Sequence, residues 1–121
     1  MEKMSVSEFR KLGRKAFSSK SKYKNKRTFY NGRWYDSKKE SERAFELDSL
    51  KKANVVKEWT PQVRYRFEHN GVLIGTYVLD FKVEYSDGTV EHEDVKGYKT
   101  DVYKIKKKLM KAFYDIDIKE L

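Results

Sequence analysis

The residues best suited to chemistry lie in two short segments of the second half of the chain. Asp94 and Lys96 are separated by one residue. On a β-strand, whose side chains alternate between the two faces, both would therefore point to the same side. Asp80 lies upstream in an apolar run, where an unpaired buried carboxylate would be costly. Two carboxylates beside an ammonium group suit the binding of a divalent cation and a phosphate.

Whether the two carboxylates meet depends on the turn between the segments. A two-residue loop would send Asp94 to the opposite face from Asp80, which would refute the site. A three-residue loop with Gly88 at positive φ pairs Tyr85 with Thr89 and places Asp80 opposite Asp94. Facing carboxylates repel unless a divalent cation lies between them, so we predict the three-residue loop together with a metal.

The elements that would position these residues follow from hydrophobic period and turn signals. Ser37 or Asp36 caps a helix that runs to about Ala53, and a second helix spans about 101–114. The remaining elements are a short helix at 7–17, an aromatic hairpin at 28–35 with an Asn-Gly turn, strands at 61–69, 72–85 and about 89–96, and a final strand within 115–121. This pattern predicts an α+β fold whose core has the order helix, three strands, helix, strand.

The same periods assign faces. One face of the 72–85 strand is expected to be apolar, with Asp80 on the other. Its apolar members are Tyr77, Leu79, Phe81, Val83 and Tyr85. The buried face of the first helix is expected at Ala44, Leu47, Leu50 and Lys51, with Phe45 beside it. The buried face of the last helix is expected at Val102, Ile105, Leu109, Ala112 and Phe113.

Three further titratable residues lie near the candidate site in the expected fold, namely Glu40, Glu93 and His92. Glu40, in the first turn of the first helix, is either the partner of Ser37 in a capping box or a metal ligand, and the residues alone favour the cap. Glu93 would point away from Asp94 and is left out of the site. His92 would share the face of Asp94, where it either contacts DNA or, as is more usual for a lone histidine, is a surface residue.

Charge distribution indicates a polyanionic partner. The formal net charge is +9, and residues 9–35 contain ten basic and no acidic residues. The alternative is a solvated tail. Lysines of the last helix, including Lys111, either are solvated or hold a phosphate backbone. The candidate DNA-binding residues are Arg10, Lys11, Arg14, Lys15, Lys20, Lys22, Lys24, Lys26, Arg27, Lys99, Lys104, Lys107 and Lys108.

Composition narrows the other possibilities. The chain has no cysteine, which excludes disulfides and thiolate zinc sites, and it has two scattered histidines. Any metal would therefore bind carboxylates, as Mg²⁺ or Mn²⁺ does. No apolar run is long enough to span a membrane and no signal peptide is evident, so we expect a cytoplasmic protein.

The order of elements, with Glu40 on the first helix, Asp80 on the second core strand and Asp94-x-Lys96 on the third, resembles the PD-(D/E)xK nuclease superfamily over about 35–121. Within it the chain is similar to a family of small phage-encoded proteins, through 36–40 and 93–103. It is also similar to phage Holliday-junction resolvases of the endonuclease I type, through a Ser-x-x-Glu helix start. Leu79 stands where the superfamily has proline, and Asp94 takes its variable acidic position.

The resemblance implies a restriction-endonuclease-like core at 28–121, with a mixed central sheet of about four strands flanked by helices. A basic helix and arm at 1–27 would precede this core. It also implies that Asp80, Asp94, Glu40 and the Val95 carbonyl hold Mg²⁺ or Mn²⁺. Lys96 would orient the attacking water or stabilise charge on the phosphate. The expected activity is endonucleolytic hydrolysis of DNA, selective for four-way junctions or other branched forms, by a homodimer that makes two symmetric cuts. A nickase, a restriction-like nuclease, an RNase and a non-catalytic nucleic-acid-binding module remain open.

Overall fold

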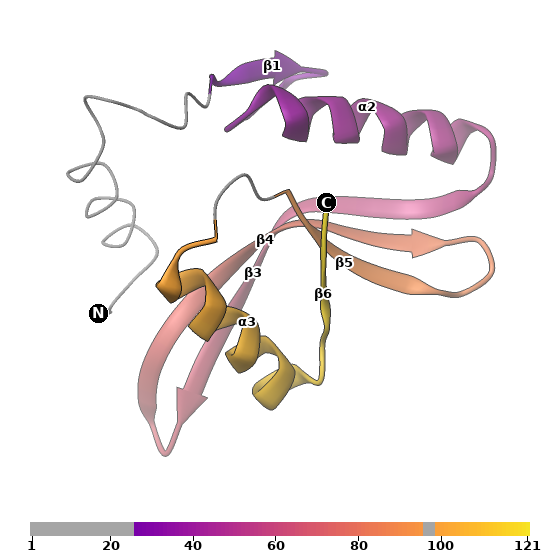
Figure 1. The fold of residues 1–121 in the computed structure, drawn as a ribbon. Helices are drawn as coiled ribbons and strands as arrows, with labels where there is room; N and C mark the ends of the chain where they lie inside the picture. The colour runs from indigo at the N-terminus through magenta and orange to yellow at the C-terminus, as the bar shows by residue number, and fades with distance from the viewer. Residues whose placement is uncertain (1–25, 96–98) are drawn as a thin grey trace.

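The structure is a computed structural model, and it describes residues 26–95 and 99–121. The helix expected at 7–17 lies outside these residues. A two-stranded hairpin is followed by a four-stranded mixed sheet and two helices, an α+β arrangement (Figure 1). The elements are β1 (Thr28–Tyr30), β2 (Arg33–Tyr35), α2 (Lys38–Lys52), β3 (Val56–His69), β4 (Val72–Tyr85), β5 (Val90–Asp94), α3 (Asp101–Tyr114) and β6 (Ile118–Glu120).

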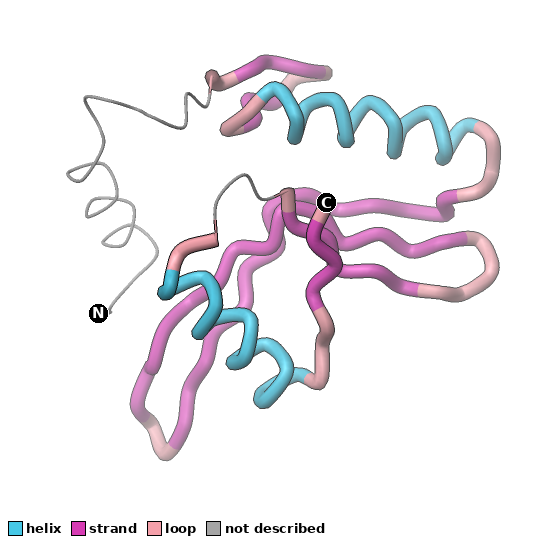
Figure 2. The backbone as a smooth tube through the Cα atoms, in the orientation of Figure 1, coloured by secondary structure: helices cyan, strands magenta, loops and turns pink. Residues whose placement is uncertain are grey.

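The sheet has the order β3-β4-β5-β6, with β3 to β5 antiparallel and β6 parallel to β5. The predicted order of elements and the mixed sheet of about four strands are confirmed. The paired β3 and β4 extend well beyond the shorter strands, and α3 lies beside this extension, whereas α2 lies over the opposite end of the sheet (Figure 2). Helices and sheet together bury two separate apolar clusters.

Local signals explain where most elements begin and end. The β1–β2 turn places Asn31 and Gly32 at φ +49° and +83°, as an Asn-Gly hairpin requires. The hydroxyl of Ser37 caps α2 by accepting the amide of Glu40 at 3.1 Å. The predicted start of the first core strand was wrong, because β3 begins at Val56 and passes through Pro61. Proline is tolerated there because β3 is an edge strand.

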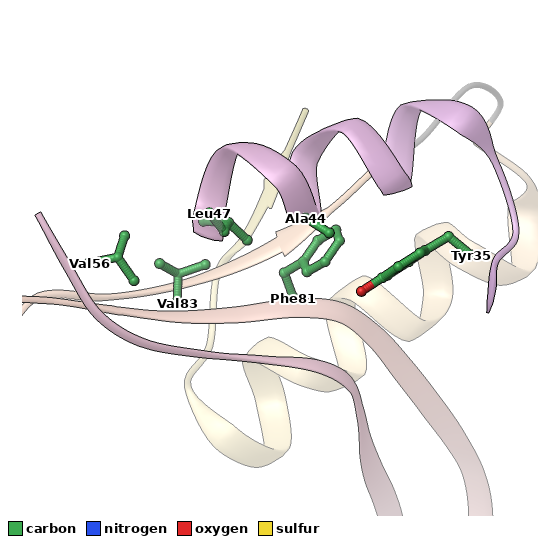
Figure 3. Packing of buried hydrophobic residues seen from close by; sticks show 6 residues of the cluster. All are labelled: Tyr35, Ala44, Leu47, Val56, Phe81 and Val83. Carbon is green, nitrogen blue, oxygen red and sulfur yellow. The ribbon is translucent and has the colours of Figure 1, made fainter. Parts of the chain in front are cut away.

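The first cluster lies between α2 and the sheet. Figure 3 shows Phe81 and Val83 of β4 directed towards α2, with Tyr35 beside Phe81. The rings of Tyr35 and Phe81 are stacked with centroids 6.3 Å apart. Lys51, predicted on the inner face of α2, is instead exposed and pairs with Glu58 at 3.1 Å. The cluster consists of Tyr35, Ala44, Leu47, Val56, Phe81 and Val83.

The second cluster joins α3 to the long hairpin and β6, and it corrects the predicted face of α3. The buried residues of this helix are Tyr103, Lys106 and Met110, whereas Ile105 is 57% exposed and Ala112 is also exposed. The predicted stripe was therefore displaced by about one residue along the chain. The cluster consists of Phe67, Tyr77, Leu79, Tyr103, Met110 and Ile118.

The apolar side of β4 changes its partner at Asp80. Phe81 and Val83 belong to the α2 cluster, whereas Tyr77 and Leu79 belong to the α3 cluster. The predicted apolar residues of β4 are thus buried or partly buried as expected, but they pack against two different helices instead of one common core. On β3, Gln62 has φ +55°, and the register runs from Pro61↔Phe81 to Val63↔Leu79 without a Gln62–Asp80 pair. The left-handed Gln62 thus coincides with an interruption of the β3–β4 pairing at the position opposite Asp80.

Candidate metal and nucleic-acid site

The turn between β4 and β5 has the predicted form. The amide of Tyr85 donates to the Thr89 carbonyl at 2.7 Å, and Gly88 has φ +94°. The register then runs through Val83↔Glu91 to Phe81↔Glu93. Its next step places Asp80 opposite Asp94, so the three-residue loop is confirmed.

At the position of Asp80 and Asp94, hydrogen bonds from backbone amides to the two carboxylates take the place of backbone-to-backbone hydrogen bonds between β4 and β5. The amide of Val95 donates to Oδ2 of Asp80 at 2.9 Å, and the amide of Asp80 donates to Oδ1 of Asp94 at 3.3 Å. The side chains of Asp80 and Asp94 are also hydrogen-bonded to each other. Each carboxylate thus satisfies a backbone donor at the end of the strand pair, which fixes the two acidic groups side by side.

Burial raises the pKa of Asp80 to about 9, with further increases from the negative charges of Asp94 and Glu40. Without a cation, the partly buried carboxyl group of Asp80 therefore holds its proton more tightly than an exposed aspartate does. A divalent cation would replace that proton and relieve the repulsion between the acidic groups.

Tyr77 supports Asp94 from the neighbouring strand. Its hydroxyl donates to Oδ2 of Asp94, which is 1% exposed. Burial and the negative charge of Asp94 raise the pKa of Tyr77, which keeps its hydroxyl a donor. Sequence reasoning read Tyr77 as a core aromatic and missed this contact, which depends on the change of partner along β4.

Glu40 lies close enough to Asp80 for its charge to raise the pKa of that residue, and it is 7% exposed in the first turn of α2. Within residues 26–95 and 99–121, no three histidine, cysteine or acidic side chains are already gathered as a metal-binding group. Asp80, Asp94 and Glu40 are thus neighbours rather than a closed ligand set. Lys96 lies outside the described residues, and Val95, whose carbonyl was also predicted as a ligand, is partly buried.

The available donors nevertheless fit Mg²⁺ or Mn²⁺. Asp80, Asp94 and Glu40 offer hard carboxylate oxygens, which these ions prefer. The side-by-side placement of Asp80 and Asp94 is the observation that favours a cation here, because a divalent ion between neighbouring carboxylates relieves their repulsion.

Two neighbouring residues had been assigned outside the site. Glu93 is fully buried on the side of α2, where Arg43 binds both of its oxygens, so its predicted orientation away from Asp94 is confirmed. His92 is not a simple surface residue, because its ring packs edge-on to Tyr65 with centroids 6.4 Å apart. Partial burial and the charge of Lys82 lower the pKa of His92.

The lysines of α3 gather along one pocket of about 660 Å³ between α3 and β6. Lys99 and Lys107 each pair with Glu120 at 3.0 Å, and Lys111 pairs with Asp115 at 2.9 Å. Hydrogen bonds from Lys99, Tyr103 and Lys107 lower the pKa of Glu120 to about 2. The lysines that line the pocket are Lys99, Lys104, Lys107, Lys108 and Lys111. Four of them had been predicted to contact DNA.

The other predicted contacts divide between two places. Lys26 and Arg27 are exposed at the start of the β1–β2 hairpin. The predicted residues from Arg10 to Lys24 lie outside the described part of the chain. Lys106, which was not singled out from the sequence, is 8% exposed on the inner side of α3.

Fold and site together define a small α+β arrangement with the buried Asp94 and the partly buried Asp80 side by side, and with a lysine-lined pocket along α3. A family model described as a protein of unknown function (DUF1064) matches residues 20–120, and the chain belongs to that family. No curated protein and no solved structure matches the chain. Among the described residues, neither helix is long and apolar enough to cross a membrane.

Proposed function

We propose that this protein is a metal-dependent endonuclease of the PD-(D/E)xK type with a restriction-endonuclease-like core. The observation that carries the proposal is the pairing of Asp80 with Asp94 at the end of the β4–β5 ladder. An acidic residue whose pKa is raised by burial and by a neighbouring carboxylate, as that of Asp80 is, is typical of functional centres. Glu40 near Asp80 supplies the third acidic group expected from the resemblance.

Each residue has a distinct role in this proposal. Asp80, Asp94 and Glu40, with the Val95 carbonyl, would hold the ion. Tyr77 holds the Asp94 carboxylate in place through its hydroxyl. Bound Mg²⁺ or Mn²⁺ would supply polarisation of the scissile phosphate and a more acidic water. Lys96, two residues after Asp94, would orient that water or stabilise charge on the phosphate.

The substrate proposed is DNA, and branched DNA in particular. The lysine-lined pocket along α3 follows the acidic pair in the chain and supplies cations for a phosphate backbone. A four-way junction requires two symmetric cuts, so the active form would be a homodimer. If the protein is phage-encoded, as the resemblance implies, it would act in the cytoplasm of the bacterial host.

The test is incubation with labelled four-way junction, flap and linear duplex DNA, with Mg²⁺ or with chelator. Wild type should cleave in Mg²⁺, and Asp80→Ala should not. Glu84→Gln is the matched control, because Glu84 lies on the same strand and is partly exposed. Cleavage of the junction but not of the duplex supports the branched substrate. If wild type cleaves none of these substrates, the proposal that the protein is an endonuclease is contradicted.

A non-catalytic nucleic-acid-binding module is the second candidate. The observation that favours it is that the lysine-lined pocket is built from α3 and β6 without any contribution from Asp80 or Asp94. Binding of DNA that is equally tight in wild type and Asp80→Ala, with no cleavage by either, would support this alternative.

A further inference from the structure

The outer surface of the β1–β2 hairpin carries two large aromatic rings. Phe29 and Trp34 pair across the hairpin and are 54% and 55% exposed. Their ring centroids are 5.2 Å apart, with an interplanar angle of 65°. A single exposed apolar residue is unremarkable, but a contiguous aromatic pair on the surface indicates a contact.

The remaining aromatic residues of the hairpin anchor it and leave this pair outside. Tyr35 is buried against Phe81. Tyr30 donates to Asp48 at 2.6 Å and packs edge-on to Phe45 of α2. Because alternate residues of a strand face opposite sides, Phe29 and Trp34 are directed away from this anchored side. The hairpin thus holds the exposed rings on a fixed base.

The basic residues near this aromatic pair favour a nucleic acid as its partner. The approach to the hairpin contains the exposed Lys26 and Arg27, and residues 26–35 include no Asp or Glu. The guanidinium of Arg27 lies 5.1 Å from the centroid of the Trp34 ring. Exposed aromatic rings beside cations bind single-stranded nucleic acid, because a base stacks on a ring while its phosphate meets the cation.

We propose that Phe29 and Trp34 form a stacking surface for an unpaired nucleotide. The inference rests on the proposed nuclease function and specifies its substrate as DNA with unpaired bases, such as a junction or flap. The position of the hairpin supports this, because the helix that carries Glu40 begins directly after β2. Tyr35 of the same hairpin packs on Phe81, the residue next to Asp80. The hairpin is therefore attached to an element of the candidate site, while its exposed rings stay on its outer side.

A competing account is that the pair only stabilises the hairpin, since cross-strand aromatic pairs do so. Fluorescence of Trp34 separates the two accounts. The chain has two tryptophans, and Trp59 is partly buried with its indole N–H donating to Asp48 at 3.1 Å. Trp59→Phe leaves Trp34 as the reporter, and a further Asp80→Asn change prevents cleavage during titration.

In this background, oligothymidylate should quench Trp34 emission by about half or more, whereas blunt duplex of equal length should quench it much less. In the same Asp80→Asn chain with Trp59 retained, Phe29→Ala and Trp34→Ala should each weaken oligothymidylate binding by about tenfold or more, and Trp34→Phe should retain most of the affinity. The control is Val72→Ala, because Val72 is an exposed apolar residue at the tip of the β3–β4 hairpin. This variant should bind oligothymidylate as tightly as the parent chain does.

Unchanged Trp34 emission together with unchanged affinity of Trp34→Ala would overturn the inference. If Trp34→Ala instead converts a dimer to a monomer in sedimentation and oligothymidylate leaves the emission unchanged, the surface joins two copies of the chain, and the inference is again overturned. The two proposals fail separately. Mg²⁺-dependent cleavage that survives Phe29→Ala and Trp34→Ala removes the stacking surface only, whereas quenching without any cleavage removes the nuclease only.

Discussion

Arg43 of α2 forms a bidentate ion pair with the fully buried Glu93 of β5, with Nη2 2.7 Å from Oε2 and Nε 2.9 Å from Oε1. Glu93 immediately precedes Asp94 in the chain. The bidentate pair therefore ties the helix that carries Glu40 to the strand that carries Asp94 from the side opposite the acidic pair. It holds two elements of the candidate site in register without entering the site.

Breaking this ion pair should destabilise the fold. Arg43→Met leaves the Glu93 carboxylate buried without its cation, and we expect a loss of about 3 kcal/mol in the free energy of unfolding. Urea denaturation followed by circular dichroism measures it. The exposed Lys51–Glu58 pair provides the control, and Lys51→Met should cost less than about 1 kcal/mol. Equal losses in the free energy of unfolding for the two substitutions would show that the buried ion pair stabilises the fold no more than the exposed one does.

Asp80→Asn should stabilise the metal-free protein at alkaline pH. The folded-state pKa of about 9 lies above the ordinary value of 3.8, so the folded chain retains a proton that the unfolded chain releases. Stability contributed by this proton is complete below about pH 4 and is lost as pH rises towards 9. In chelator at pH 9, the variant should therefore unfold at a higher temperature, by an amount equivalent to about 1 kcal/mol or more.

The difference between wild type and Asp80→Asn should shrink on acidification to pH 5, which thermal melts at the two pH values would reveal. Glu84→Gln, on the same strand but partly exposed, should show no such pH dependence. A lower melting temperature for Asp80→Asn at pH 9 would contradict the raised pKa.

Tyr77→Phe should weaken metal binding while preserving the fold. The substitution removes the hydroxyl that donates to Asp94 and keeps the ring in the α3 cluster. Loss of a partner that orients a ligand typically costs about 10- to 100-fold in metal affinity. Calorimetric titration with Mn²⁺ measures it, and Tyr65→Phe, on the neighbouring strand, is the control. The positioning role is contradicted if both variants bind Mn²⁺ as wild type does.

Lys104→Ala and Lys108→Ala should each weaken DNA binding similarly for all sequences. Both lysines line the α3 pocket and are exposed. Each phosphate contact that is lost should lower the slope of log affinity against log salt by about 1. Fluorescence anisotropy over a salt series measures the slope in the Asp80→Asn background. Lys57→Ala, on the edge strand β3, should leave the slope unchanged. If all three substitutions behave alike, the pocket does not contact DNA.

Local signals predicted much of this fold. Asn31-Gly32 and Asn70-Gly71 mark tight turns, and Gly88 determines the β4–β5 register that pairs Asp80 with Asp94. Ser37 caps α2 as its position suggested. Each of these features depends on a few neighbouring residues, whose conformational preferences are readable without the rest of the molecule.

Features that depend on distant contacts were not predictable in the same way. Lys106 is buried although lysine usually faces solvent, and the buried face of α3 differs from the predicted one by about one residue. The Arg43–Glu93 pair joins elements far apart in sequence, and Tyr77 meets Asp94 across two strands. These contacts arise because α2 and α3 pack against different parts of a twisted strand pair, which hydrophobic alternation alone does not encode.

The most direct test of the central claim is the single-turnover rate of four-way-junction cleavage in Mg²⁺, for wild type, Asp94→Asn and Glu84→Gln. If the carboxylate pair of Asp80 and Asp94 holds the catalytic ion, wild type and Glu84→Gln cleave at similar rates. Asp94→Asn should then bind the junction but cleave it at least about 100-fold more slowly. Equal rates for wild type and Asp94→Asn, or no Mg²⁺-dependent cleavage by wild type, would contradict the claim.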